Sequence, residues 1–229
     1  RGEPSTRNGL RCGRLAPDYM HDEAWTTLPT LLQQLQIERP VLLGHSDGAS
    51  IALLHASRFP VQACVVMAPH VMVEDITLRA IAQAREAFEQ GDLRSRLARY
   101  HANADCAFWQ WNDAWLNPAF RDFDIRDNCR HINAPVLAIQ GLDDPYGGMA
   151  QIEQINLPGH QIQREALADC GHSPQRDQTA RTTALIADFP ARRGSEAGLA
   201  ALMSASSLGP RQRTRTGPSA YTVRPPSCE

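Results

Sequence analysis

The residues with the clearest chemical potential are a serine, a histidine and a pair of aspartates, each in a turn that contains glycine. Ser46 is the central residue of the pentapeptide GHSDG, which fits the Gly-x-Ser-x-Gly pattern of a strained strand-to-helix turn. His172 lies in the tetrapeptide GHSP, and Asp143 and Asp144 follow a Gly-Leu pair. A serine hydroxyl becomes a strong nucleophile only when a base removes its proton and a carboxylate orients that base. These residues therefore predict nucleophilic catalysis by Ser46, with His172 as base and either aspartate as the acid.

Each of these residues also has an ordinary explanation. A Gly-x-Ser-x-Gly pentapeptide occurs by chance, and His172 is one of 8 histidines, any of which could lie on the surface. Aspartates after a glycine are common turn residues and helix caps. The order serine, acid, histidine along the chain favours the catalytic interpretation, because all three then follow predicted strands.

Apolar runs predict the elements that would position these residues. Buried strands are expected at 41–44, 63–68, 135–140 and 161–167. Helices are expected at 22–37, with Asp22 as its cap, from Ser46 to about Phe59, at 149–155 and at 177–189. Strands that alternate with helices indicate an α/β fold with a parallel sheet, whose active groups lie at the carboxyl ends of the strands.

The segment 74–131 is predicted to be wholly helical, with helices at 76–89, 93–100 and 106–116. Phe108, Trp111 and Trp115 fall on one face of the third helix, and Trp109 lies beside them. An aromatic stripe of this kind either packs in a core or lines a ligand site.

Composition bounds the class of protein. The 229 residues are 42% hydrophobic and 21% charged, which suits one globular domain, and the net charge of −2 indicates neither a nucleic-acid nor a membrane partner. The 6 scattered cysteines argue against a zinc site or a disulfide framework and favour a reducing, cytoplasmic location. No apolar run has membrane-spanning length. Two segments, 1–17 and 190–229, are rich in Arg, Gly, Pro and Ser. The first is predicted to be a disordered or remnant loop, and the second is predicted to be a disordered tail.

On the residues above, the segment 18–189 resembles the α/β-hydrolase fold family. The resemblance is specific at the turn around Ser46, at the acid turn and at the Gly-His-x-Pro sequence around His172. In that family the acid usually stands three residues after the turn glycine and often precedes proline, which selects Asp144 over Asp143. The resemblance implies a core of 18–73 and 132–189 with a cap of 74–131. The chain looks most like enol-lactonases, carboxylesterases and carbon–carbon bond hydrolases.

The resemblance implies a serine hydrolase that cleaves an ester, a lactone or an activated carbon–carbon bond of a small molecule. Ser46 would form an acyl-enzyme, with His172 as base and Asp144 as orienting acid. The backbone N–H of Asp47 would stabilise the oxyanion, and no metal or organic cofactor is implied. The cap would bind the substrate through its aromatic residues: Phe108, Trp109, Trp111 and Trp115.

The sequence also departs from the family. In the family, four strands precede the strand that leads to the serine turn, which is called the nucleophile elbow. The loop after the third of these strands carries a His-Gly motif. This sequence contains neither the four strands nor the motif. We therefore expect a chain truncated at its N-terminus, with an unpaired strand edge, a tendency to self-associate and slow turnover. The alternative hypothesis is a truncated, non-catalytic α/β-hydrolase-like protein that lacks part of its oxyanion hole.

Overall fold

A computed structural model describes residues 13–158 and 162–189. The chain divides into one unit of Arg1–Ala191 and a second unit of Arg192–Glu229. The second unit lies entirely outside the described residues, as do residues 1–12. The predictions of a disordered tail at 190–229 and of a loop over most of 1–17 therefore fall on residues outside the description.

The core of the fold is a parallel sheet of four strands in the order β1-β2-β3-β4. The strands are β1 (Val41–His45), β2 (Ala63–Met67), β3 (Val136–Gly141) and β4 (Ile162–Leu167). Leu42, Cys64, Val136 and Ile162 occupy matching positions across the sheet. All the strands predicted from the apolar runs are present within two residues of their expected bounds. The α/β fold class is confirmed.

Helices connect the strands, as parallel pairing requires. They are α1 (Tyr19–Asp22), the π-helix η1 (Glu23–Thr27), α2 (Leu28–Gln34), α3 (Asp47–Ala56), α4 (Asp75–Gln90), α5 (Leu93–Leu97), α6 (Ala104–Trp115), the 3₁₀-helix η2 (Pro118–Asp122), α7 (Arg126–Cys129), α8 (Ala150–Glu153), α9 (Pro174–Asp177) and α10 (Thr179–Asp188). The prediction that Asp22 caps the first helix is wrong, because the helical segment begins at Tyr19 and Asp22 is its fourth residue. The closing helix is broken at Gln178, whose φ of −131° is not helical.

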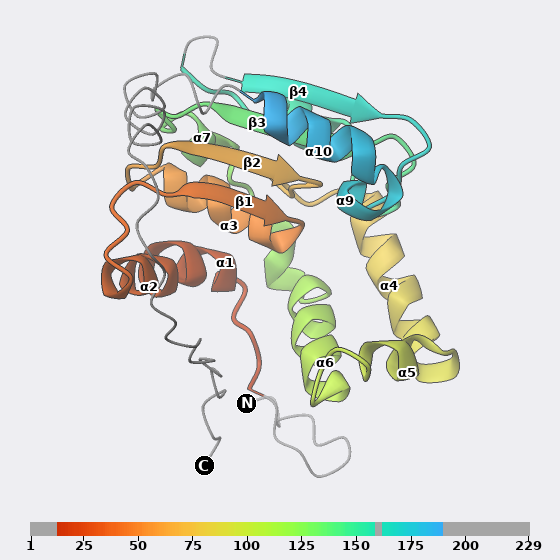
Figure 1. Cartoon of the computed structure of the whole chain (residues 1–229). Helices are drawn as coiled ribbons and strands as arrows, with labels where there is room; N and C mark the ends of the chain where they lie inside the picture. Colours follow the sequence, from red (N-terminus) through yellow and green to blue (C-terminus); the bar gives the residue numbers. More distant parts are fainter. Residues whose placement is uncertain (1–12, 159–161, 190–229) are drawn as a thin grey trace, which may run out of the picture. The chain divides into compact units, whose positions relative to one another are not determined.

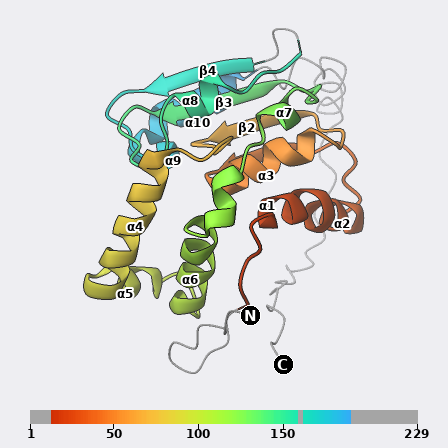
Figure 2. The same cartoon turned by 180° about the vertical axis from the view of Figure 1, so that it is seen from behind.

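The sheet is covered on both faces by helices (Figures 1 and 2). The side chains of β2 alternate between two apolar clusters, because successive residues of a strand point to opposite faces. Cys64 and Val66 belong to the cluster that includes α3, and Ala63, Val65 and Met67 to the cluster that includes Leu185 of α10. The strand is buried throughout, which explains why its sequence is a continuous apolar run.

The segment between β2 and β3 carries α4, α5 and α6, which extend from the carboxyl ends of the strands (Figure 1). These helices share a small apolar cluster of their own, in which Phe88 of α4 stacks on Phe108 of α6 with ring centroids 3.9 Å apart. The prediction of a wholly helical segment needs one correction, since Met72 and Asp124 form an isolated antiparallel bridge at its base. Its role as a cap over the site stays a prediction.

β1 is an edge strand among the described residues and is incompletely covered. Val41 and Leu43 are 50% and 57% exposed, and their side chains share one face because they are two residues apart. Exposed apolar side chains continue in the preceding helical segment at Leu31 and Leu35. An unpaired edge at this strand was expected from the sequence.

Two further observations concern the predicted location and the cysteines. In the part of the chain that the structure describes, no helix has the length and apolar character needed to cross a membrane. Cys64, Cys129 and Cys170 are free, whereas Cys106 is disulfide-bonded, which the scattered spacing of the cysteines did not predict.

Candidate active site

Ser46 lies at the apex of a strained turn between β1 and α3. Its φ of 55° and ψ of −127° are unfavourable for a residue with a side chain, and its N–H donates to the carbonyl of Met67 at 2.9 Å. Gly44 must be glycine, because a Cβ there would lie 2.7 Å from Ala49 Cα and still closer to the Gly48 carbonyl. Gly48 has no such constraint, since a Cβ there meets nothing within 4 Å. Close packing therefore requires glycine at position 44 but not at position 48.

The three residues singled out by the sequence lie in one hydrogen-bonded row. His172 Nε2 is 2.9 Å from Ser46 Oγ, and His172 Nδ1 is 2.9 Å and 3.1 Å from Asp144 Oδ2 and Oδ1. They come from the turns after β1, β4 and β3, whose carboxyl ends meet at one edge of the sheet (Figure 1). With Nδ1–H donating to Asp144, Nε2 is left to accept the serine proton.

Asp144, and not Asp143, contacts His172. The Asp144 side chain is 1% exposed, and it also accepts hydrogen bonds from Tyr146 N and Gln140 Nε2, each at 2.8 Å. Burial raises the pKa of Asp144, but the hydrogen bond and charge of His172 and the other two donors outweigh it and bring the pKa below its ordinary value. The carboxyl group is therefore ionised at neutral pH. Asp143 is exposed.

Gly141 brings the acid turn against the histidine loop. A Cβ at this position would overlap the carbonyl oxygens of Gly171 and Cys170. The two loops are further joined by the N–H of Asp143, which donates to the Cys170 carbonyl at 2.9 Å. Only glycine allows this approach, and the approach sets the distance between Asp144 and His172.

Asp47 directly follows Ser46 and is the first residue of α3, so its N–H has no acceptor within the helix. An N–H in this position can point to negative charge that develops beside Ser46. Its side-chain carboxyl group accepts a hydrogen bond of 2.5 Å from the Tyr19 hydroxyl. Burial raises the pKa of Asp47, and Tyr19 and the nearby Trp115 indole lower it in part. Asp47 Oδ1 and Trp115 Nε1 are both buried and make no hydrogen bond among the described residues.

We refer to Ser46, His172 and Asp144 together as the triad. Of the four aromatic residues expected to bind substrate, two lie against residues that contact the triad. Trp115 is edge-on to His70 with ring centroids 4.7 Å apart, and Trp111 lies 6.5 Å from Tyr146. His70 and Tyr146 in turn lie 5.8 Å and 4.8 Å from His172. Phe108 and Trp109 instead pack against Phe88 within the cluster of α4 and α6. The structure does not bring these two residues to the triad.

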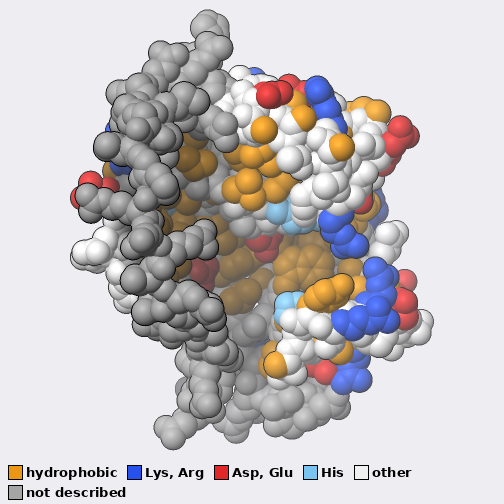
Figure 3. All heavy atoms as spheres, viewed as in Figure 1, with side chains coloured by type: hydrophobic (Ala, Val, Ile, Leu, Met, Phe, Trp, Pro, Cys, Tyr) orange, Lys and Arg blue, Asp and Glu red, His pale blue; other side chains and the backbone are white. Residues whose placement is uncertain are grey.

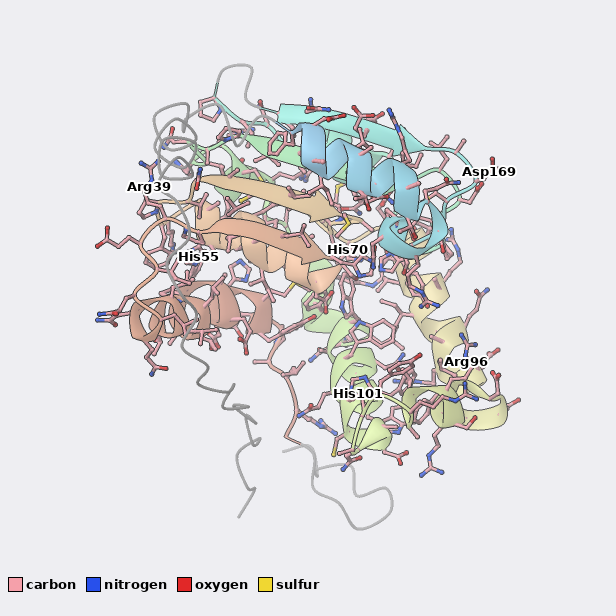
Figure 4. All side chains as sticks on the ribbon, viewed as in Figure 1. Arg39, His55, His70, Arg96, His101 and Asp169 are labelled. Atoms are coloured by element: carbon pink, nitrogen blue, oxygen red, sulfur yellow. The ribbon has the colours of Figure 1, made fainter. Side chains whose placement is uncertain are left out.

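Sequence reasoning missed three residues that surround His172. His45 Nε2 donates to the carbonyl of His172 at 2.6 Å and so holds the histidine loop against the elbow. His70 follows β2, and Tyr146 lies in the acid turn. Figure 4 labels His70 where the strands end, beside the loops that carry the triad. The signal that could have found His70 is its position directly after a buried strand, which was the criterion applied to Ser46 and His172.

Figure 3 shows apolar side chains gathered on the face that is drawn, with histidine side chains among them. No group of three or more His, Cys, Asp or Glu side chains within the described ranges is arranged to hold a metal ion. The polar groups in hydrogen-bonded contact here are the Ser46 hydroxyl, the His172 imidazole and the Asp144 carboxylate.

Comparison with known proteins agrees with this arrangement. A sequence profile of the alpha/beta hydrolase family matches residues 6–185, so the chain belongs to that family. A search of curated proteins by sequence gave no match.

Solved structures show the same fold at low sequence identity. A meta-cleavage product hydrolase from Pseudomonas fluorescens has 20% identity and a TM-score of 0.55, with 77% of this chain and 72% of that chain covered. The enol-lactonase from Burkholderia xenovorans has 17% identity and a TM-score of 0.55, with 78% and 75% covered. A thermophilic esterase from Thermogutta terrifontis has 18% identity and a TM-score of 0.52, with 79% and 74% covered.

Proposed function

We propose that the protein is a serine hydrolase that cleaves an ester, a lactone or an activated carbon–carbon bond of a small molecule through an acyl-enzyme. The observation that carries the proposal is the continuous hydrogen-bonded row from Ser46 through His172 to Asp144, with distances of 2.9 Å at both contacts. The similar structures of a carbon–carbon bond hydrolase, an enol-lactonase and an esterase support the same range of substrates.

The geometry accounts for each step. His172 Nε2 accepts the proton of Ser46 as its oxygen attacks the carbonyl carbon, and Asp144 stabilises the imidazolium that results. His172 then returns the proton to the leaving group. Water enters in the second half-reaction, loses a proton to His172 and releases the acid product. The N–H of Asp47 stabilises the negative oxygen in both halves.

Turnover is expected to be slow. Acyl transfer usually employs two oxyanion donors, and removal of one typically reduces turnover by about a hundredfold to a thousandfold. Within the described residues, the N–H of Asp47 is the one donor that we assign to this role.

A second candidate is a non-catalytic member of the family. The observation that favours it is the exposure of Val41 and Leu43 at the edge of the strand that carries Ser46, because an incompletely covered strand supports a strained turn less well. A measurement on the whole chain separates the two candidates.

The test is hydrolysis of a nitrophenyl ester by the purified protein beside its Ser46→Ala variant. The proposal predicts slow release of nitrophenolate that is lost in Ser46→Ala. As a matched control, Ser57→Ala removes a serine hydroxyl from the other end of α3 and should keep the activity of the wild type. Equal rates in the wild type and Ser46→Ala would support the non-catalytic candidate.

A further inference from the structure

His70 is buried beside His172, and one of its ring nitrogens has no hydrogen-bond partner. The residue is 3% exposed, and its Nδ1 atom is buried and unpaired among the described residues. A buried polar atom without a partner destabilises a fold, and in native structures such atoms usually bond a water or a ligand.

The position of His70 is fixed by its backbone and its ring contacts. Ser50 Oγ accepts from the N–H of His70 at 3.0 Å and donates to its carbonyl at 2.7 Å. The ring contacts those of Trp115 and His172, with centroid-to-centroid distances of 4.7 Å and 5.8 Å. An imidazole held this firmly against the catalytic histidine is placed to contact a substrate that occupies the site.

The ring of His70 is neutral. Burial, with smaller contributions from His172 and His45, lowers its pKa to about 3 despite the opposing charge of Asp144. A neutral imidazole offers one N–H donor and one nitrogen acceptor, so it suits an uncharged polar group such as a carbonyl or a hydroxyl.

The ionised carboxyl group beside the site disfavours a second anion. Asp144 Oδ2 lies 2.9 Å from His172, and the pKa of Asp144 is below its ordinary value, whereas Asp47 is buried with a raised pKa and adds no positive charge. No hydrogen bond or ion pair joins an arginine to His70 or to either carboxyl group in the part of the chain that the structure describes. Arginines that pair elsewhere include Arg85 with Asn112 and Asp113, Arg94 with Asp105, Arg126 with Asp124, Arg181 with Glu165, and Arg164 with backbone carbonyls.

We infer that the site accepts an uncharged acyl compound whose acyl part carries a second, neutral polar group, and that this group hydrogen-bonds to the ring of His70. The inference rests on the proposed function and narrows its substrate class. Within that class it excludes esters and lactones whose acyl part is a carboxylate.

The test compares three nitrophenyl esters that differ at one end of the acyl chain. Nitrophenyl butyrate carries no distal polar group, nitrophenyl methyl succinate carries a neutral ester, and nitrophenyl hydrogen succinate carries a carboxylate near neutral pH. The quantity measured is the rate constant for acylation of Ser46, followed by nitrophenolate release and by the intact mass of the acyl-enzyme. We expect the methyl succinate to acylate the wild type at least about tenfold faster than the hydrogen succinate.

Two substitutions test the role of His70. His70→Phe keeps a ring but removes both nitrogens, and it should lower the rate ratio of methyl succinate to butyrate by about tenfold. His70→Gln keeps a donor and an acceptor and should retain most of that ratio.

The outcomes separate this inference from the proposed function. Faster acylation by the hydrogen succinate would overturn the inference about charge, and an unchanged ratio in both variants would overturn the role of His70. A reaction with all three esters that is insensitive to Ser46→Ala would contradict the proposed function itself.

Discussion

The Nε2 atom of His172 lies 2.9 Å from the hydroxyl oxygen of Ser46, although 126 residues separate the two in the sequence. The contact exists because β1 and β4 are parallel strands whose carboxyl ends face the same edge of the sheet. The loop of His172 is held there by the His45 donor and by the approach of Gly141. Each of these supports can be tested.

Asp144 is expected to orient His172. Asp144→Asn should reduce nitrophenyl ester hydrolysis by about a thousandfold or more, because an amide at this position favours the wrong histidine tautomer. Asp143→Asn is the matched control and should keep most of the activity, since Asp143 is exposed and does not contact His172. Both rates are read in the same ester assay. A severe loss in Asp143→Asn with little change in Asp144→Asn would reverse the assignment.

The glycines at the ends of the pentapeptide should differ sharply in their tolerance of a methyl group. Gly44→Ala should lower the free energy of unfolding by about 3 kcal/mol or more, because its Cβ meets the backbone of Gly48 and Ala49. Gly48→Ala should raise that free energy by up to about 1 kcal/mol, since the position is helical and open. Urea unfolding followed by circular dichroism measures both. Equal effects of the two substitutions would contradict the packing described at Gly44.

His70 should make stability depend on pH. Its pKa is about 3 in the folded protein against an ordinary value of 6.5, so the unfolded chain binds more protons between these values. Stability is therefore lost as pH falls from neutral, by about 2 kcal/mol between pH 7 and pH 5 from this group alone. His70→Phe should remove this contribution to the fall in the free energy of unfolding. The other buried histidines contribute the same amount in the wild type and in the variant. Urea unfolding at the two pH values gives the difference, and an identical decline in the variant would refute it.

The exposed edge of β1 should promote self-association. Leu43→Lys places a charge on the uncovered face and should shift the protein toward the monomer in analytical ultracentrifugation. Tyr100→Lys is the control, because Tyr100 is 84% exposed and lies after α5, outside the sheet. If Tyr100→Lys reduced association as much as Leu43→Lys, the edge of β1 would not be the contact.

Much of the fold and the hydrogen-bonded row of Ser46, His172 and Asp144 could be predicted from the sequence. The strands are short apolar runs bounded by turns, and Ser46, Asp144 and His172 each follow one of them. Parallel topology then brings the strand ends together, so position along the chain was sufficient to predict the contact. Asp144 could be separated from Asp143 only through the resemblance to a known family.

The remaining features depend on packing between segments that are distant in sequence. Phe108 and Trp115 share a helix face, but seven residues span about 10 Å of helix, so the two ends of the stripe meet different neighbours. Phe108 meets Phe88, whereas Trp115 meets His70. The unpaired Nδ1 atom of His70 can be recognised only once Trp115 and His172 are in place around the ring. The early start of the first helical segment reflects the burial of Tyr19 and Met20.

The central claim is that Ser46 is a nucleophile activated by His172, and covalent labelling tests it most directly. The whole protein is treated with an alkyl fluorophosphonate, and the adduct is measured by intact mass and mapped by peptide sequencing. The account predicts one adduct, on Ser46, that is absent in Ser46→Ala and forms about a hundredfold or more slowly in His172→Gln. Folded protein that gives no adduct, or that labels equally fast in His172→Gln, would contradict it.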